Sequence, residues 1–454
     1  FNYLFAKSQG GDFVLRVEDT DIERNVPGAE KSQLHDLIWL GIIPDESPEK
    51  PNPKYAPYRQ TEKLDIYHQY ADWLVEHGYA YECYCSEEEL QTSRDEQIAR
   101  GIAAPQYDRH CLHLSEAQKE AYQKEGRKPT IRIRVKDHHE ISFIDLVRGK
   151  VTFNNDDIGD WVIMKSNGIP TYNFAVVVDD HLMDITHVLR GEEHLSNTPK
   201  QIQLYEYFGW DIPHFGHMTI IVNENGKKLS KRDLNILQFM SQYRDLGYLP
   251  EAIFNFILLL GWTPSEEREI YTIEEAAKVF SLDRLSSSPS MFDPQKLAWM
   301  NAHYIKAMDG ESYFAFIKPF LAKVLDLSTY DESWLRFVAS LFKEQIKTGQ
   351  EIVDLLSPLF APLPELDGEA LEIMKLDTSA KVIETFAQLL GQLPSIEPET
   401  IKQLFKDVQL RLGVKGKALY MPIRLQLTGM MHGLEMINII KVLGKEESLR
   451  RLNK

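Results

Sequence analysis

The sequence has few cysteines and no long apolar run. Its longest apolar stretch, residues 253–262, contains Asn255 and Gly261 and is far shorter than the roughly 20 residues that span a membrane. Three cysteines are too few, and odd in number, for a secreted disulfide scaffold. No signal peptide is recognisable. We therefore expect a folded cytoplasmic protein without membrane association, which the composition of 43% hydrophobic and 26% charged residues also indicates.

Positive charge is scarce over most of the chain. Its 51 Lys and Arg face 68 Asp and Glu, a net charge of −17, which on average repels nucleic acid. Residues 401–454 reverse this balance with eleven Lys and Arg against four Asp and Glu, a net charge of +7. A basic segment on an acidic protein is what a phosphate-rich partner requires. Charge alone, however, favours the alternative, a solvated helical surface with no such partner.

The glycine-rich loops that usually hold nucleotide phosphates are missing, because neither a Walker A pattern nor G-x-G-x-x-G is present. If ATP binds, another architecture must hold it. The candidate is a short basic loop after residues 218–222, since mobile lysines can stabilise the charge that develops on a leaving pyrophosphate. Short basic loops are also common without any such role. The loop comprises Lys228, Leu229, Ser230, Lys231 and Arg232.

All three cysteines belong to one pattern. The pair Cys83 and Cys85 is followed, 25 residues later, by the pair Cys111 and His113. Four soft or borderline ligands are what Zn²⁺ needs for a tetrahedral site. No glutamate positioned to activate a water molecule accompanies them, so the pattern predicts one structural zinc ion per chain. The alternative is three unrelated buried thiols and a surface histidine.

Strand and helix signals alternate up to about residue 305. β-Rich runs bounded by turn residues predict strands, and apolar residues at spacings of three and four predict helices. From about residue 309 only the helical spacing recurs, for example at Phe314, Ile317 and Leu321. The sequence therefore predicts an α/β part with an insertion, followed by an all-α domain. The expected strands are 13–17, 130–135, 141–146, 150–153, 161–165, 176–178 and 185–189.

Several charged and polar residues fall where a ligand would bind in an α/β sheet. Glu18 follows the expected strand 13–17, and Arg190 ends the expected strand 185–189. Ligands of open α/β sheets bind at the carboxyl ends of the strands. A carboxylate there can hold an ammonium group, and an arginine can bind a carboxylate through two hydrogen bonds. The alternative is that these are ordinary turn and helix-capping residues.

These motifs together resemble those of a bacterial-type glutamyl-tRNA synthetase, a class I aminoacyl-tRNA synthetase. The resemblance runs over essentially the whole chain. One departure is that the first class I signature, similar to His-Ile-Gly-His, is absent and would lie upstream of Phe1. We therefore expect the chain to be truncated before that motif. A second is Leu434, where the family often has proline after His-Gly. The segments that carry the resemblance are 1–6, 15–21, 56–62, 170–175, 178–181, 190–194, 228–232, 413–417 and 421–429.

The resemblance implies a fold and a division into domains. The expected fold is an α/β Rossmann-like catalytic core with an inserted α+β acceptor-stem domain, followed by an all-α anticodon-binding domain. The core would comprise residues 1–60 and 166–222. The insertion that carries the zinc site would be 61–165. Residues 223–308 would form the stem-contact region, with the basic loop at its start, and 309–454 the anticodon-binding domain.

The resemblance also implies a reaction. L-Glutamate would be activated by ATP, accompanied by Mg²⁺, to glutamyl-adenylate and then transferred to the 3′ end of tRNA-Glu. Glu18 would hold the α-ammonium group, Tyr172 would hydrogen-bond the amino acid, and His194 would lie in the same site. Arg190 would pair with the side-chain carboxylate, and Lys231 would stabilise the pyrophosphate.

The tRNA contacts implied by the resemblance lie near the C-terminal end. Arg424 resembles a position that contacts anticodon bases, whereas Lys415 and Lys417 flank a glycine and suit phosphate contacts. Family members are commonly monomeric, so we expect a monomer.

Three other interpretations compete with this one. A glutaminyl-tRNA synthetase would carry a β-barrel anticodon domain, which the strandless region after residue 309 does not suggest. The glutamyl-queuosine-tRNA enzymes lack an anticodon domain. A non-catalytic, zinc-containing tRNA-binding paralogue would explain the missing first signature, but it has no use for the pyrophosphate-binding Lys231.

Overall fold

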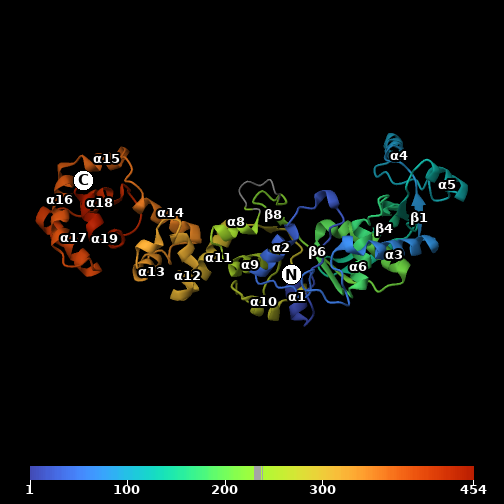
Figure 1. Ribbon diagram of the computed structural model, residues 1–454, viewed down its shortest axis with the longest axis horizontal. Coiled ribbons are helices and arrows are strands. Elements are labelled where there is room, and N and C mark those ends of the chain that lie inside the picture. The colour runs from blue at the N-terminus through green and yellow to red at the C-terminus, as the bar shows by residue number, and fades with distance from the viewer. Residues whose placement is uncertain (230–236, 238) are drawn as a thin grey trace. The chain divides into compact units, whose positions relative to one another are not determined.

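The computed structural model describes residues 1–229, 237 and 239–454, and it divides into two compact units (Figure 1). The first unit comprises Phe1–Ile236 and Ile253–Pro294, and the second comprises Leu237–Ala252 and Gln295–Lys454. Ser230, Lys231 and Arg232 of the basic loop lie outside the described residues. No helix in the described part of the chain is long and apolar enough to span a membrane.

The centre of the first unit is a parallel strand pair. Strands β6 (His187–Gly191) and β7 (His214–Met218) are joined by helix α7 (Thr198–Phe208), and their register places Arg190 opposite His217. The end of the hairpin strand β3 (Glu140–Asp145) runs beside β7, because the backbone N–H of Leu146 donates to the carbonyl of Phe215 at 2.8 Å. Three strands thus bring their ends to one edge. Strand β4 (Gly149–Asn154) completes the hairpin, and β8 (Ile221–Val222) pairs in parallel with β9 (Ser290–Met291).

An antiparallel sheet in the same unit carries the thiol pattern. Its strand order is β1 (Ala80–Cys83), β2 (Thr130–Ile133) and β5 (Val162–Met164). Between β1 and β2 the chain forms α4 (Glu87–Ala99) and α5 (Glu116–Lys124), which begin at the capping boxes of Ser86 and Ser115. The remaining helices of the unit are α1 (Asn2–Ser8), α2 (Ala29–Trp39), α3 (Leu64–Glu76), α6 (Tyr172–Leu182) and α10 (Ile273–Val279), with α9 (Pro250–Gly261) crossing the boundary to the second unit.

One predicted strand is wrong. Residues 176–178 lie in helix α6, in which every residue from Phe174 to Asp180 is buried. A helix that is buried on all sides shows no amphipathic period, and its β-branched residues then resemble a strand of a parallel sheet. The expected strand 13–17 makes only isolated parallel bridges, from Val14 to Glu46 and from Val17 to Arg59. The strands expected near 130, 141, 150, 161 and 185 are confirmed.

The second unit is helical, as the sequence predicts, and the described residues contain no strand after Met291. One continuous apolar core runs through it, and aspartates cap two of its helices, Asp309 at α12 and Asp331 at α13. The helices are α8 (Met240–Asp245), α11 (Pro294–Ala307), α12 (Gly310–Leu321), α13 (Glu332–Ser340), α14 (Gly349–Phe360), α15 (Gly368–Met374), α16 (Asp377–Gln392), α17 (Pro398–Leu412), α18 (Lys417–Thr428) and α19 (Met436–Leu452).

A buried arginine connects three helices of this unit. Arg451, only 6% exposed, donates to the carbonyl oxygens of Leu427 at 2.6 Å and Leu359 at 2.7 Å, which end α18 and α14. Its Nε donates to Glu447 one turn earlier on α19 at 2.6 Å. Because carbonyls at helix ends have no partner within their own helix, Arg451 satisfies groups that burial would otherwise leave unpaired.

Candidate active site and metal centre

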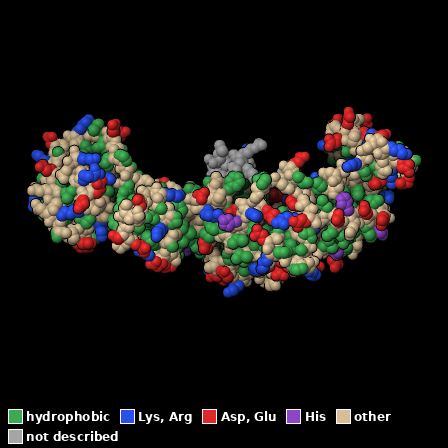
Figure 2. All heavy atoms as spheres, in the orientation of Figure 1, with side chains coloured by type: hydrophobic (Ala, Val, Ile, Leu, Met, Phe, Trp, Pro, Cys, Tyr) green, Lys and Arg blue, Asp and Glu red, His purple; other side chains and the backbone are tan. Residues whose placement is uncertain are grey.

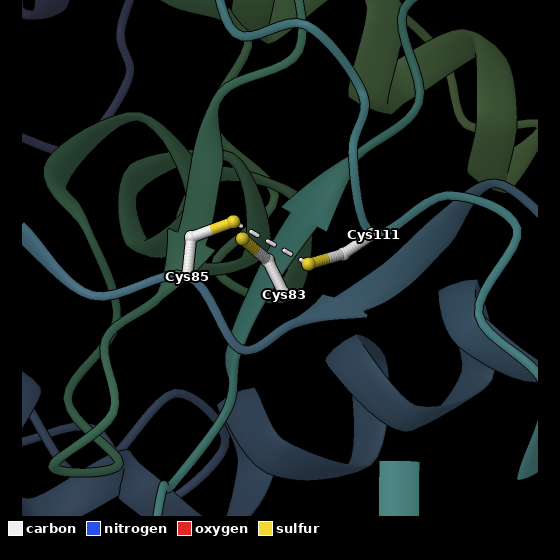
Figure 3. A group of neighbouring side chains, drawn as sticks. All are labelled: Cys83, Cys85 and Cys111. Carbon is white, nitrogen blue, oxygen red and sulfur yellow. Dashed lines mark hydrogen bonds between the residues drawn. The ribbon is translucent and has the colours of Figure 1, made fainter. Parts of the chain in front are cut away.

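The three cysteines come together at the edge of the β1 sheet (Figure 3). Their sulfur atoms all lie within 4.8 Å of one another, and those of Cys85 and Cys111 are 3.5 Å apart. Three thiolates bound at about 2.3 Å around one tetrahedral Zn²⁺ would be roughly 3.8 Å apart. The observed group therefore fits a single zinc ion in both donor chemistry and spacing.

The fourth predicted ligand is not part of this group. His113 is exposed, and among the described residues the group of possible metal ligands contains only the three thiols. The hydroxyl of Tyr107 is closer, at 3.4 Å from the sulfur atoms of both Cys83 and Cys85, and it accepts a 2.9 Å hydrogen bond from the backbone N–H of Cys111. The structure thus brings together three of the four predicted ligands and adds a phenol oxygen beside them.

The surroundings favour a thiolate at Cys83. Hydrogen bonds from the thiols of Cys111 and Cys85 hold its pKa far below the usual range, and Tyr107 and Arg132 contribute in the same direction against the effect of burial. Arg132 is 7% exposed, and its guanidinium lies 4.1 Å from the centre of the Tyr107 ring. A thiolate is the form of cysteine that binds metal.

A cluster of buried charges lies behind Glu18. Arg16 contacts Asp180 at 2.7 Å, Asp179 at 3.4 Å and Glu18 at 3.5 Å, while Lys63 contacts Asp179 at 3.0 Å. Two cations and three carboxylates leave a net charge of −1. Burial raises the pKa of the Glu18 carboxyl, although Arg16 opposes the rise. Glu18 retains 38% side-chain exposure, so an incoming cation can reach it and neutralise the cluster.

Arg190 is held by uncharged acceptors. Its Nε lies 3.1 Å from Nε2 of His217, and its Nη2 donates to Thr198 at 2.9 Å and to Gln201 at 2.8 Å. No carboxylate is among its hydrogen-bond partners in the described residues. Burial lowers the pKa of Arg190, while attraction to Tyr172 acts against this. The site therefore holds a buried cation whose charge no hydrogen-bonded anion neutralises.

The other two predicted glutamate-binding residues adjoin Arg190. The rings of Tyr172 and His194 are 5.6 Å apart, and burial raises the pKa of Tyr172. Burial lowers the pKa of His194, and the nearby charge of Arg190 adds to that effect. Tyr172 also interacts electrostatically with both Glu18 and Arg190. The structure thus groups all four predicted residues around one site.

The described start of the basic loop lies beside the same strands. Lys228 forms a 2.9 Å ion pair with Glu193, two residues after the end of β6, and its side chain remains 57% exposed. The backbone N–H of Leu229 donates to the carbonyl of Ile221 at 3.1 Å. Lys231, the predicted catalytic residue, falls outside the described residues.

The predicted tRNA contacts are distributed around α18. Arg424 is half-buried, its Nη2 donates to the carbonyl of Leu434 at 2.7 Å, and its buried Nη1 has no partner among the described residues. Lys415 is exposed, and Lys417 is ion-paired with Glu369. Figure 2 shows Lys and Arg side chains interspersed with Asp and Glu on the visible face of the C-terminal helices.

Comparisons with known proteins agree on one family. Residues 1–299 match the catalytic domain of class I tRNA synthetases (E and Q), and residues 313–454 match an anticodon-binding domain. The chain is 52% identical to the glutamate–tRNA ligase of Geobacillus thermodenitrificans over 458 aligned positions, which cover the whole chain and 94% of that protein. It is 50% identical to that of Bacillus subtilis with the same coverage.

The chain belongs to the glutamate–tRNA ligase family. A crystal structure of a glutamate tRNA ligase from Elizabethkingia meningosepticum in complex with its amino acid superposes with a TM-score of 0.90 and 34% identity. The alignment covers the whole chain and 94% of that structure. The predicted family and the predicted fold class are thereby confirmed.

Sequence analysis missed several residues of this glutamate–tRNA ligase site. Lys63 and Tyr107 gave no signal, because a lysine on a helix and a tyrosine in a loop are usually exposed. Asp145 is the last residue of β3, and His217 lies near the end of β7. Like Arg190, each therefore lies near the end of a short β-rich run, and this position was the available signal in the sequence. The structure places both within the network that surrounds Arg190.

Proposed function

We propose that the chain activates L-glutamate with ATP and transfers it to the 3′ end of tRNA-Glu. The observation that supports this most directly is the pair of complementary charges in one site. The cluster of Arg16, Lys63, Asp179, Asp180 and Glu18 has a net charge of −1, one positive charge short of neutrality. Arg190, in turn, has no anionic hydrogen-bond partner among the described residues. An amino acid with an ammonium group and a side-chain carboxylate supplies both.

The same arrangement discriminates against glutamine. Nε and Nη2 of Arg190 already donate to His217, Thr198 and Gln201, and the guanidinium also interacts with the Tyr172 hydroxyl. In the proposal the side-chain carboxylate accepts from Nη1, beside Tyr172. A glutamine side chain would turn its NH₂ donors toward these donors or rotate its amide at the cost of other contacts. A buried donor without an acceptor costs about 1–3 kcal/mol.

Activation and transfer are two displacements. An oxygen of the α-carboxylate attacks the α-phosphorus of ATP, and the bond to the leaving pyrophosphate breaks. A ribose hydroxyl at the 3′ end of the tRNA then attacks the activated carbonyl, and AMP leaves. Mg²⁺ bound with ATP would supply positive charge at the phosphates. In the proposal Lys231, within its loop, stabilises the negative charge on the leaving pyrophosphate, and Lys228 and Arg232 add to the positive potential.

Zinc has a structural role in this proposal. Cys83, Cys85 and Cys111 would hold the ion and so fix the loop between β1 and β2, and His113 or Tyr107 would supply the fourth ligand. Unpaired thiols kept for a metal suit a reducing compartment, which supports a cytoplasmic location. We take the enzyme to act as a monomer.

Charging assays with the purified protein test the function. Glutamate with tRNA-Glu should give ATP-dependent aminoacylation, while glutamine should give little with any tRNA. The assay should include tRNA-Gln as a second acceptor, because the anticodon contacts decide whether it is also charged. A protein that binds tRNA and zinc yet forms no aminoacyl-tRNA would support the non-catalytic paralogue instead.

The anticodon contacts can be separated by paired substitutions. In Arg424→Ala we expect weaker charging of the cognate tRNA and a smaller preference for the correct anticodon, because a planar guanidinium can bond the edge of a base or stack on it. In Lys415→Ala we expect equal weakening for all tRNAs and a salt dependence reduced by about one phosphate contact. Should Arg424→Ala lose thermal stability while anticodon preference stays intact, its bond to Leu434 is purely structural.

A further inference from the structure

Behind Arg190 lie two buried side chains, Asp145 and His217, that the reaction described so far does not use. Asp145 and His217 have completely buried side chains, and Nδ1 of His217 lies 2.6 Å from the Asp145 carboxylate. On the other side of the ring, Nε2 lies 3.1 Å from Nε of Arg190 and 3.0 Å from the hydroxyl of Thr198. The ring thus connects a carboxylate on β3 with the guanidinium on β6.

The Asp145 carboxylate fixes the tautomer of this ring. Burial alone would raise the pKa of Asp145, but hydrogen bonds from His217 and from the backbone N–H groups of Val147 and Arg148 lower it overall. An ionised carboxylate can only accept, so Nδ1 of His217 carries the hydrogen. Nε2 then presents a lone pair to the Nε–H of Arg190.

In the opposite tautomer, or in a doubly protonated ring, Nε2 of His217 would carry a hydrogen and could not accept one from Arg190. Arginine remains protonated in proteins and all of its nitrogen–hydrogen groups are donors. An N–H on Nε2 would therefore face the Nε–H of Arg190 at a heavy-atom distance of 3.1 Å. The guanidinium would have to turn away from His217. Because the group is planar, a turn about its Nε also moves Nη1 and Nη2.

We propose that His217, oriented by Asp145, is a positioning residue that sets the plane of the Arg190 guanidinium and thereby the selectivity for glutamate over glutamine. The inference rests on the proposed function, in which Arg190 receives the side-chain carboxylate. His217 itself does not touch the amino acid. It acts by supplying an acceptor at one fixed place, which sets the direction of the other nitrogen–hydrogen groups of Arg190.

Two substitutions at position 217 test the roles of the two ring nitrogens, Nδ1 and Nε2, one at a time. In His217→Asn the amide nitrogen can replace Nδ1 and still donate to Asp145, but the acceptor for Arg190 is lost. In His217→Gln the longer side chain can place its amide oxygen near the position of Nε2 and restore that acceptor. We expect kcat/KM for glutamate to fall about 10- to 100-fold in His217→Asn, the loss of one charge-assisted hydrogen bond, and clearly less in His217→Gln.

Asp145→Asn provides an independent test with nearly unchanged shape. Its amide nitrogen would donate to Nδ1, which drives the ring into the tautomer that opposes Arg190. We expect a fall in glutamate kcat/KM at least as large as in His217→Asn, carried mainly by KM for glutamate, with KM for ATP unchanged. The ratio of glutamate to glutamine use should fall in both variants. If His217→Asn does not fold, His217→Gln and Asp145→Asn carry the same test, with melting temperature as the check on folding.

The outcomes distinguish this inference from the proposed function. If the wild-type enzyme does not activate glutamate, the proposed function fails. The positioning role is overturned by a different set of results. In that case the wild type activates glutamate and Arg190→Gln loses this activity, but folded His217→Asn and Asp145→Asn keep the wild-type KM for glutamate and the wild-type selectivity. A uniform loss of kcat for glutamate, with KM and selectivity unchanged, would also overturn it, because that is the effect of general destabilisation.

Discussion

Replacing Arg190 by glutamine should lower kcat/KM for glutamate by on the order of 100-fold. Removing one member of a desolvated ion pair costs about 3 kcal/mol, which corresponds to that factor. Arg190 is the one residue of the group around Tyr172 and His194 that can supply the positive charge, and it lies at the end of β6 among uncharged acceptors. Pyrophosphate exchange at varied glutamate, with ATP saturating, measures the loss directly.

The controls for this variant address charge and geometry separately. Arg190→Lys keeps the positive charge but cannot donate to His217 and the substrate in one plane, so an intermediate loss is expected. KM for ATP should stay close to the wild-type value in both variants. An unchanged kcat/KM for glutamate in Arg190→Gln would mean that the residue serves only to join β6 to α7.

Replacing Cys111 by serine should remove the zinc ion and unfold the loop between β1 and β2. Structural zinc contributes free energy on the order of 10 kcal/mol to the folding of small isolated sites, and the loop itself has only a small apolar cluster around Cys83 and Tyr81. Elemental analysis of the wild type should give about one zinc per chain, as one four-ligand site requires. The variant should contain almost none and should be cleaved by protease between β1 and β2.

The fourth ligand can be assigned by a matched pair of variants. Tyr107→Phe removes only the hydroxyl that lies 3.4 Å from two of the sulfur atoms, whereas His113→Ala removes the predicted imidazole from an exposed position. The true ligand is the one whose loss weakens zinc retention against a chelator. Wild-type protein that folds normally with three titratable thiols and no metal would rule the zinc site out.

Sequence reasoning succeeded where the signal is local. The helical end of the chain could be predicted because each helix packs one apolar face against a common core, so its residues recur at spacings of three and four, as in α17. The proximity of the three thiols could be predicted because cysteine is rare and its spacing in the sequence is short, but the place of His113 could not. Sequence reasoning failed for residues 176–178, since a fully buried helix has no polar face to give a period.

The contacts that orient the site could not be found in this way. Asp145 and His217 are 72 residues apart in the chain, and only the pairing of β3 beside β7 brings them within hydrogen-bonding distance. The same holds for Lys63, whose ammonium meets Asp179 across 116 residues. Such contacts depend on tertiary packing, for which a single sequence carries no local pattern.

The three-way contact of Arg451 has a consequence for the order in which the protein is made. Its acceptor at Leu359 lies 92 residues earlier in the chain, and ribosomes add roughly 5–20 residues per second. After Leu359 has been synthesised, its carbonyl at the end of α14 therefore lacks the Arg451 hydrogen bond for about 5 to 20 seconds. During that interval the nascent helices expose the apolar faces that later form one core. This half of the protein is thus open to chaperones, and to aggregation, until translation has passed α19.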